Sequence, residues 1–527
     1  MAMPSPRPAA AAAKRAHVNM MTDTIVANLP APALRSVVRA LLTLHPDVTP
    51  TLEAEAKHLL LRDAGSSAPS DVQARVRCML GCGLVFESLP LLTALVERAA
   101  AEGEEDGLAV AVDGDVVQAA TAVQKMLVTA AGAREMADGE RALVRGLLEG
   151  LRRCRTACGE AGRAFPFERS AAAVAAFFEP EESGRARRIE VAPLAVEVAE
   201  RIETFEVGGR AVPRLFSGLW QLSSPAWGTA PQAKVVEQFE KYVSSGYTAY
   251  DMADHYGDAE IVFGSFRSAC SDPEMIFAAT KYCVFSPMTV NEEVVRGNVS
   301  ERCRRLKSEK VDLLQFHWQN YSDPQYIQAL KLLQADTRVS NLGLCNFDTE
   351  HMEIVLREGI DIKTNQFSLI DSRPIFKMAA VCEKYGVKLL TYGTLCGGFL
   401  AEKWLDKPEP ELFSSDITPS QRKYFEAILS WGGWQLFQTL LQTLSTIAAK
   451  HSVSVSNVAT RWVLDFSYVG AVIVGSRMGI SQRADENFAA YGWRLDDGDR
   501  EAIEEVLAKS RRAEMFEAMG DCGGEYR

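Results

Sequence analysis

The chain has 527 residues, of which 47% are hydrophobic and 24% are charged; 57 basic and 69 acidic side chains give a formal net charge of −12. This composition is typical of a globular protein and excludes a wholly disordered, collagen-like or repeat-only chain. The acidic balance argues against nucleic acid or an anionic membrane as the main partner, because both attract clustered basic side chains. The length predicts roughly three or four domains, or two if one is a large barrel.

The N-terminal residues and the cysteines bear on the compartment of the protein. The first 20 residues are rich in Pro and Ala and carry basic but no acidic side chains. They resemble a weak organelle transit peptide, but a disordered tail over residues 1–22 is the better interpretation. No stretch comes near the roughly 18 consecutive apolar residues that cross a bilayer. The eleven cysteines are irregularly spaced, which favours reduced thiols and a cytoplasmic location over a disulfide framework.

Residues 23–180 show helical periodicity and predict an all-α domain. One apolar stripe consists of Leu34, Val37, Val38, Leu41 and Leu42, and a later one of Leu143, Val144, Leu147, Leu148, Leu151, Cys154 and Cys158. An acidic and basic stretch over residues 179–188 indicates the domain boundary, with a linker over 181–200. We expect the helical domain to act as a docking module for a protein partner or as a stabilising extension of the next domain.

Two cysteine pairs in this domain, Cys78 with Cys82 and Cys154 with Cys158, raise the question of a metal site. Four thiols can bind zinc, but the i, i+4 spacing differs from the Cys-x-x-Cys knuckles of common zinc ribbons. Cysteine is also among the residue types most often buried. We therefore expect packing roles and no metal.

From residue 201 onward, short β-branched or aromatic runs alternate with amphipathic stretches, which is the pattern of βα units and a parallel sheet. Eight such runs cover residues 214–219, 248–253, 275–281, 311–317, 339–346, 362–367, 387–392 and 469–475. Eight strands with intervening helices in about 300 residues predict a (β/α)8 TIM barrel, here over residues 201–512. The first run also lacks the Gly-x-Gly-x-x-Gly turn of a doubly wound dinucleotide fold.

The predicted fold class is therefore α/β, a barrel preceded by an all-α domain and followed by a C-terminal tail over residues 513–527. The connection over residues 397–438 contains Trp404, Trp431 and Trp434. It is too long for a plain link between a strand and a helix, so we expect a substrate or lid loop there.

Four side chains suited to proton transfer stand at three successive predicted strand ends. Asp251 and Tyr256 follow the second strand, Lys281 ends the third and His317 ends the fourth. Active-site groups of such barrels lie at the carboxyl ends of the strands. An ammonium paired with a carboxylate stabilises a phenolate and lowers the phenol pKa from about 10, and a histidine can orient a carbonyl oxygen. Each residue alone fits a structural role, but together they favour a catalytic site.

These residues resemble the catalytic tetrad of the aldo-keto reductase superfamily, with the spacing Asp-x-Ala-x-x-Tyr-Gly intact from Asp251 onward. The resemblance covers roughly residues 201–510. It implies reduction of an aldehyde or ketone by hydride from a nicotinamide cofactor. In that scheme Tyr256 donates the proton, Lys281 lowers its pKa and is held by Asp251, and His317 positions the carbonyl.

The resemblance also implies contacts to the nicotinamide. The sequence Gly-Leu-Cys-Asn-Phe at 343–347 matches the family's Gly-x-Ser-Asn-Phe, with Cys345 in place of the serine. Asn346 and Gln366 are therefore expected at the carboxamide, whereas the cysteine is a weak hydrogen-bonding group. Tyr392 matches the aromatic residue that stacks on the nicotinamide ring.

After the eighth predicted strand, the sequence resembles the family's adenosine-phosphate loop and the helix that follows it. A Gly/Ser turn into a helix offers backbone N–H groups to a phosphate, and an arginine can bind a 2′-phosphate as a charged fork, which favours NADPH over NADH. We expect Arg477 or Arg483 at the 2′-phosphate and Glu486 and Asn487 beside the adenine. The full set of expected contacts is Gly475, Ser476, Arg477, Arg483, Glu486 and Asn487.

Trp220 and Trp318 adjoin predicted strand ends and are expected to line an apolar substrate pocket, the alternative being loop packing. The leading prediction is an NADPH-dependent oxidoreductase that acts on a small-molecule carbonyl substrate. The alternative is a regulatory or binding subunit that senses the nicotinamide redox state and acts through the helical domain. The fold alone does not choose between them.

Overall fold

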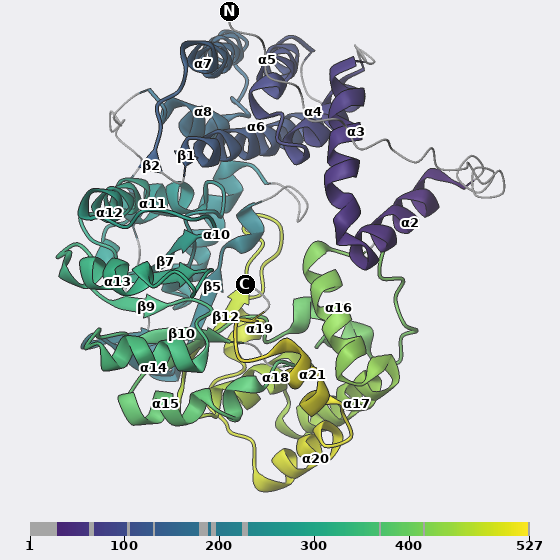
Figure 1. Cartoon of the computed structure of the whole chain (residues 1–527), viewed down its shortest axis with the longest axis vertical. Coiled ribbons are helices and arrows are strands. Elements are labelled where there is room, and N and C mark those ends of the chain that lie inside the picture. The colour runs from purple at the N-terminus through teal and green to yellow at the C-terminus, as the bar shows by residue number, and fades with distance from the viewer. Residues whose placement is uncertain are drawn as a thin grey trace, which may run out of the picture.

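The computed structural model describes residues 29–62, 68–102, 106–129, 132–178, 188–190, 196–223, 230–367, 370–414 and 417–524. The expected tail over residues 1–22 and most of the predicted linker lie outside these ranges. A helical part and a barrel are stacked along the long axis of the molecule (Figure 1). In the described part of the chain, no helix is long and apolar enough to cross a membrane.

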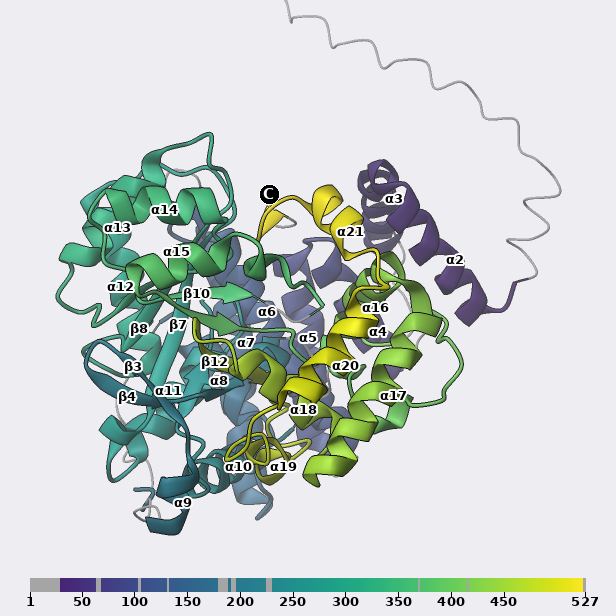
Figure 2. The same ribbon diagram turned by 90° about the horizontal axis from the view of Figure 1, so that it is seen from below.

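The barrel is a parallel eight-stranded sheet (Figures 1 and 2). Its strands are β5 (Leu215–Gly218), β6 (Ala249–Asp251), β7 (Phe277–Val284), β8 (Leu313–Trp318), β9 (Leu342–Leu344), β10 (Thr364–Phe367), β11 (Lys388–Thr391) and β12 (Val469–Gly475). They follow chain order, and β12 returns beside β5. Between β9 and β10 the Lys363 N–H donates to the Leu342 carbonyl at 2.8 Å. All eight predicted runs contain strands, and the predicted barrel fold is confirmed.

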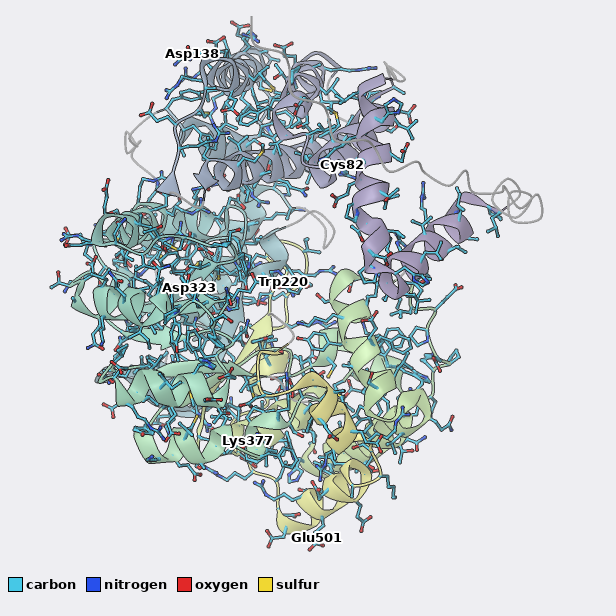
Figure 3. All side chains as sticks on the ribbon, viewed as in Figure 1. Cys82, Asp138, Trp220, Asp323, Lys377 and Glu501 are labelled. Atoms are coloured by element: carbon cyan, nitrogen blue, oxygen red, sulfur yellow. The ribbon has the colours of Figure 1, made fainter. Side chains whose placement is uncertain are left out.

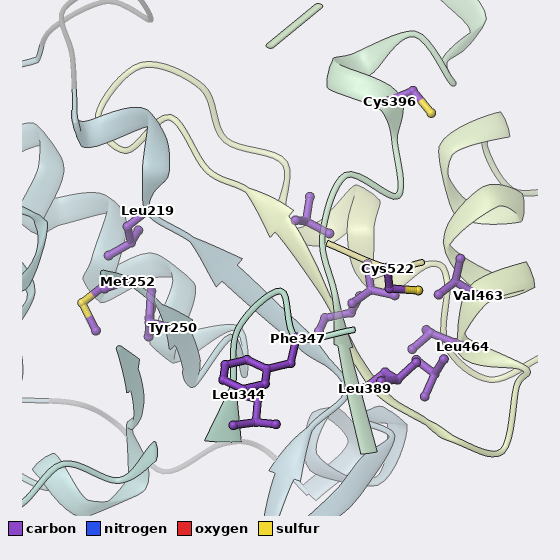
Figure 4. Close-up of a cluster of buried hydrophobic side chains, with 14 of the residues drawn as sticks. Leu219, Tyr250, Met252, Leu344, Phe347, Leu389, Cys396, Val463, Leu464 and Cys522 are labelled. Carbon is purple, nitrogen blue, oxygen red and sulfur yellow. The ribbon is translucent and has the colours of Figure 1, made fainter. Parts of the chain in front are cut away.

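Helices connect the successive strands and cover the outside of the sheet. They are α10 (Gln232–Ser244), α11 (Ala259–Ala269), α12 (Glu292–Leu306), α13 (Gln325–Ala335), α14 (Thr349–Arg357) and α15 (Met378–Tyr385). The Asn291 side chain accepts the Val294 N–H at the start of α12, which satisfies one of the free N–H groups of a first helical turn. Residues from strands, loops and helices together form the buried core (Figure 4).

A β-hairpin that the sequence did not single out precedes the barrel. Its strands are β3 (Thr204–Val207) and β4 (Arg210–Pro213). Val207 and Val212 are buried with Phe216 and Phe277 inside the sheet. The ring of Phe205 lies so close to Gly470 that a Cβ there would come within 2.5 Å of it. The hairpin therefore packs against the first residues of the barrel strands, at the end opposite the expected site.

The connection between β11 and β12 differs from the expected loop, because its second half is helical. It contains α16 (Pro419–Trp431), α17 (Gly433–His451) and α18 (Val455–Leu464). The ring of Trp434 lies 5.8 Å from that of Phe399 and 5.9 Å from that of Trp404. Trp431 and Trp434 are buried. These tryptophans form the core between the helices and the barrel, and they do not line an open loop.

The helical part comprises α2 (Ala31–Leu44), α3 (Thr49–Arg62), α4 (Pro69–Gly81), α5 (Val85–Glu102), α6 (Asp106–Met126), α7 (Asp138–Glu160) and α8 (Glu168–Ala175), with a short hairpin of β1 (Val128–Thr129) and β2 (Gly132–Ala133). The predicted stripe on α7 is buried in a hydrophobic cluster separate from that of the barrel. Cys154 and Cys158 belong to this cluster, whereas Cys78 is exposed. Among the described residues, these cysteines form no group of three potential metal ligands.

The predicted stripe on α2 is only partly covered in the described structure. None of the α2 residues is buried, and Val37 and Leu41 are 43% and 50% exposed. The polar side of this helix contacts the long connection after β11, since Arg39 Nη1 donates to the Phe413 carbonyl at 2.6 Å. Figures 1 and 2 both place α2 beside α16.

Residues 512–524 are packed, whereas the sequence predicted a tail over 513–527, of which the last three residues lie outside the described ranges. After α19 (Ala484–Phe488) and α20 (Asp497–Leu507), the chain forms α21 (Arg512–Met519), and α9 (Val196–Arg201) occupies part of the predicted linker. Cys522 is buried in the barrel core (Figure 4). The Asp521 carboxylate accepts the Thr349 N–H at 3.0 Å. This segment therefore lies against the loop that follows β9.

Candidate active site

Strands β6 and β7 bring Asp251 and Lys281 into contact. The Lys281 ammonium donates to Asp251 Oδ1 at 2.5 Å and to the Met252 carbonyl at 2.8 Å, and both charged side chains are buried. Desolvation acts to lower the pKa of Lys281, but the charge and hydrogen bond of Asp251, together with Tyr256 and Cys345, outweigh it, and the pKa rises above its ordinary value. The ammonium therefore stays charged in the interior.

Gln315 completes this pair and was not predicted from the sequence. Its Nε2 donates to Asp251 Oδ2 at 2.9 Å, so each carboxylate oxygen has a hydrogen-bond donor, as burial of a charge requires. The sequence held a signal for it, because residues 315 and 317 alternate along one strand and share a face. In the sheet register, Gln315 lies opposite Lys281.

Tyr256 lies in the turn between β6 and α11, beside the buried ion pair. The Lys281 Nζ is 5.0 Å from the centre of the Tyr256 ring, and the ring is half-buried. Burial raises the pKa of Tyr256 above its ordinary value, and the Lys281 charge acts in the opposite direction without cancelling that effect. The expected neighbours are thus together, but the net direction differs from the expected one, and the phenol is held as a neutral acid.

His317 contacts the loop after β9 through its Nδ1, which lies 3.0 Å from the Cys345 carbonyl. A carbonyl oxygen only accepts, so Nδ1 carries the hydrogen in this contact. A neutral ring then presents Nε2 as an acceptor, and donation from Nε2 to a carbonyl requires the doubly protonated ring. Cys345 itself is buried, and burial raises the pKa of its thiol to about 12.

Phe285, a residue that the sequence did not single out, stands over this end of the barrel. Its ring lies 5.3 Å from that of His317 and 5.1 Å from that of His255, and 52% of the residue is exposed. The His255 ring is in turn 4.8 Å from that of Tyr256. Phe285 follows β7 directly, so it offers an apolar surface between the predicted acid and the predicted positioning histidine.

One group of three potential metal ligands, Asp254, His255 and Cys283, occurs within the described ranges. Asp254 Oδ2 accepts the Cys283 N–H at 2.9 Å and lies 3.5 Å from Arg302 Nη1. Burial raises the pKa of Cys283 well above its ordinary value, and a protonated thiol is a poor ligand. The guanidinium supplies the positive charge here, and we assign no metal to the group.

The residues expected at the nicotinamide are partly engaged with one another. The Tyr392 hydroxyl donates to Asn346 Oδ1 at 2.9 Å. Asn346 has a left-handed backbone, with φ +58°, which short polar residues tolerate. Gln366 lies on β10, and its side chain is outside the described part of the structure. Asn346 and Tyr392 therefore meet at one end of the barrel, as the resemblance implies.

The loop after β12 is more closely tied to the barrel than expected. The Ser476 N–H donates to the Gly218 carbonyl at 2.9 Å, and its Oγ accepts the Ser217 hydroxyl at 2.6 Å. The Ser476 N–H is therefore engaged within the barrel, and a contact from Ser476 to a phosphate stays a prediction. Gly475 lies against Gln221, whose Nε2 a Cβ would approach to 2.3 Å.

Three cations gather beyond this loop. Arg483 pairs with Glu486 at 3.1 Å, a largely exposed and therefore weak pair, and Arg477 is exposed. The pKa of Lys403 is lowered by burial and by the charges of Arg483 and Arg477. Lys403, which the sequence did not indicate, comes from the long connection after β11, and both predicted arginines are near enough for their charges to act on it. Asn487 lies nearby, half-buried on α19.

The two tryptophans expected in a substrate pocket differ in their surroundings. Trp318 is only 2% exposed, and its indole N–H donates to the carbonyls of Asn320 and Asp323 at 2.7 and 3.1 Å. It thus anchors the loop after β8 and does not form an open pocket wall. Trp220 is exposed and lies in the short helical turn that follows β5, near the middle of the view in Figure 3.

A (β/α)8 barrel with a buried Asp–Lys pair, a tyrosine and a histidine at one end defines a class of barrel oxidoreductases. The chain belongs to the aldo/keto reductase family, whose model matches residues 214–508. This match does not include the helical part. The family supports an oxidoreductase that acts on carbonyl groups.

Individual relatives are distant. The chain is 25% identical over 297 residues to flagellar radial spoke protein 5 of Chlamydomonas reinhardtii, covering 50% of this chain and 54% of that protein, or about half its length. It is 22% identical over 311 residues to the aldo-keto reductase YhdN of Bacillus subtilis, covering 57% of this chain and 91% of that protein. A solved structure of glycerol dehydrogenase from Gluconobacter oxydans matches 59% of this chain and 96% of its own, with 23% identity and a TM-score of 0.49.

Proposed function

We propose that the protein is an NADPH-dependent reductase of small aldehydes or ketones, with Tyr256 as the proton donor. The observation that supports this most directly is the buried Asp251–Lys281 pair beside the Tyr256 ring. It fixes a positive charge next to the phenol, where negative charge develops as the proton leaves.

Each of these residues has a different role in one proton transfer. Tyr256, held neutral by burial, carries the proton to the substrate oxygen. Lys281 stabilises the phenolate that remains, while Asp251 and Gln315 keep the ammonium in place. His317 orients the carbonyl when doubly protonated and accepts from the alcohol when neutral. A bound nicotinamide supplies the hydride.

The donor set fits NADPH at two places. Lys403, Arg477 and Arg483 form a cation cluster suited to a 2′-phosphate, since among the described residues the ion pair of this group is the exposed one between Arg483 and Glu486. At the barrel end, the Asn346 amide and the Tyr392 ring lie together, which suits a carboxamide and an aromatic ring. Binding there requires the hydrogen bond between Tyr392 and Asn346 to open.

The proposal is tested by Tyr256→Phe, which removes only the acid. We expect carbonyl reduction to fall by roughly 10²-fold to 10⁴-fold, while NADPH still quenches protein fluorescence. Tyr282→Phe is the matched control, because the hydrogen-bond partner of the buried Tyr282 hydroxyl among the described residues is the Met288 sulfur, at 3.5 Å. A Tyr256→Phe variant with a near wild-type rate would refute the role of Tyr256.

A second candidate function is a nicotinamide-sensing subunit of a protein assembly. It is favoured by the similarity to a radial spoke protein and by the exposed apolar residues of α2. Tight NADPH binding without turnover across a broad panel of aldehydes and ketones would support this function over the reductase.

All eleven cysteines are free thiols, which supports a reducing, cytoplasmic compartment in either case.

A further inference from the structure

The helical part reaches the barrel through a buried ion pair. Arg169 of α8 donates from Nε and Nη2 to the two carboxylate oxygens of Asp258, at 2.9 and 2.7 Å. The two side chains are 5% and 2% exposed. A bidentate pair of this kind fixes orientation as well as distance, because both hydrogen bonds must be satisfied together.

Asp258 belongs to the turn that carries Tyr256. The Tyr256 carbonyl accepts the Ala259 N–H at 3.1 Å, and the Asp258 carbonyl accepts the Val262 N–H at 2.9 Å. Between them, Gly257 has φ +60° and little intrinsic preference for one conformation. The turn therefore depends on its neighbours to hold Tyr256 in place.

A second, indirect link connects the helical part with the same turn. Arg305 of α12 donates from Nη2 to the Gly257 carbonyl and from Nη1 to the Gln124 side chain of α6, the latter at 2.9 Å. Arg305 is also held by Glu260, at 2.7 Å. Helix α8 thus contacts the Tyr256 turn directly through Arg169, and α6 is linked to it through Arg305.

The position of Arg169 on α8 is itself fixed. Ser170, the next residue of α8, donates from its N–H and its hydroxyl to Asp113 Oδ1 of α6, at 3.0 and 2.5 Å. The buried carboxylate of Asp113 also interacts with the Arg169 charge. Arg169 therefore projects from two helices that are joined to each other.

We propose that Arg169 is a positioning residue for Tyr256: through Asp258, the helical part holds the turn that presents the proton donor. The proposal rests on the proposed function insofar as Tyr256 is the donor. It gives the helical part, which the family match does not include, a role in the reaction.

The experiment uses the full chain with the double variant Arg169→Met/Asp258→Asn, because removing both charges avoids leaving a buried carboxylate alone. Arg169→Lys keeps the charge but not the fork. Glu168→Gln is the control, since this neighbour in α8 forms only an exposed pair with Arg155. The measurements are kcat and KM for a carbonyl substrate, fluorescence quenching by NADPH, and hydrogen–deuterium exchange of the peptide 251–262.

We expect the double variant to lose roughly tenfold or more in kcat, since small misplacements of a reacting group are costly. KM and the NADPH dissociation constant should change by less than about threefold. Exchange should rise in the peptide 251–262, Arg169→Lys should recover part of kcat, and Glu168→Gln should match the wild type.

Two results would overturn the proposal. One is a folded double variant with wild-type kcat and wild-type exchange in the turn. The other is a parallel loss of kcat, cofactor affinity and melting temperature, which indicates general destabilisation. If the wild type itself shows no turnover, the proposed function fails, and the exchange of the turn decides about positioning alone: faster exchange in the double variant supports it and unchanged exchange overturns it.

Discussion

Asp113→Asn is expected to make the protein more stable at neutral pH. Asp113 is buried between α6 and α8, where it accepts the Ser170 N–H and hydroxyl. Burial raises the pKa of Asp113 from 3.8 to about 6, although Arg169 and Ser170 act to lower it. The ionised Asp113 carboxylate thus lowers the free energy of unfolding. An asparagine keeps an oxygen that accepts from Ser170 and carries no charge.

The size and sign of the effect follow from this pKa. The difference between about 6 and 3.8 is about two units, which corresponds to roughly 3 kcal/mol. Because the folded pKa is the higher one, the unfolded chain loses its proton first as pH rises. The contribution of Asp113 to the wild-type free energy of unfolding therefore declines between about pH 4 and pH 6 and stays reduced above that range. The Asp113→Asn variant lacks this carboxyl group, so this decline does not occur in it.

Urea unfolding of both proteins from about pH 5 to about pH 8 measures the difference directly. We expect the difference in free energy of unfolding between Asp113→Asn and the wild type to grow from about pH 5 to about pH 6. Above about pH 6 it should level off, at up to about 3 kcal/mol. Asp138→Asn, which removes an exposed carboxylate at the start of α7, is the matched control. A pH-independent difference for Asp113→Asn, or a less stable variant at the high end, would refute the reasoning.

Two further predictions concern the long connection after β11. Lys403→Met should raise the dissociation constant for NADPH by roughly tenfold or more and leave that for NADH nearly unchanged, because a charge-assisted contact to the 2′-phosphate is lost; equal changes in fluorescence titrations would contradict this. Trp434→Ala should lower the free energy of unfolding by about 3–5 kcal/mol in urea, because the ring is buried; a selective loss of cofactor affinity without destabilisation would show that the ring contacts the site instead.

The barrel could be predicted because its signals are local. Strands of a parallel sheet are covered on both faces, so each appears as a short apolar run, and all eight runs contain strands. The same holds for the motif that begins at Asp251, whose spacing is set by one strand and one turn. Lys281 follows from the next strand end, and the sheet register pairs Asp251 with Ala279, two residues before Lys281 on the same face of β7.

Contacts between distant segments could not be predicted. Arg169 and Asp258 are separated by 89 positions, and neither has a neighbour pattern that indicates the other. Lys403 lies within range of the charges of Arg477 and Arg483 because the connection after β11 folds back toward the loop after β12.

Ser476 shows a related difficulty, because backbone groups carry no sequence signal. A Gly/Ser turn after a strand predicts free N–H groups, yet the Ser476 N–H donates to the Gly218 carbonyl, at 2.9 Å. The stripe on α2 is a further example: periodicity predicts an apolar face but does not say what covers it, and here none of its residues is buried.

The chemical nature of the contact between the helical part and the barrel indicates the role of this interface. Each part has its own hydrophobic cluster, and the contacts that join them near the Tyr256 turn are polar, with Arg169 on Asp258 and Gln124 on Arg305. Desolvation offsets much of the attraction in a buried ion pair, so such a pair contributes little net stability, whereas breaking it by removing one partner is costly. An apolar contact would tolerate sliding, but a bidentate fork does not. This interface is therefore better suited to fixing the orientation of one turn than to holding two domains together.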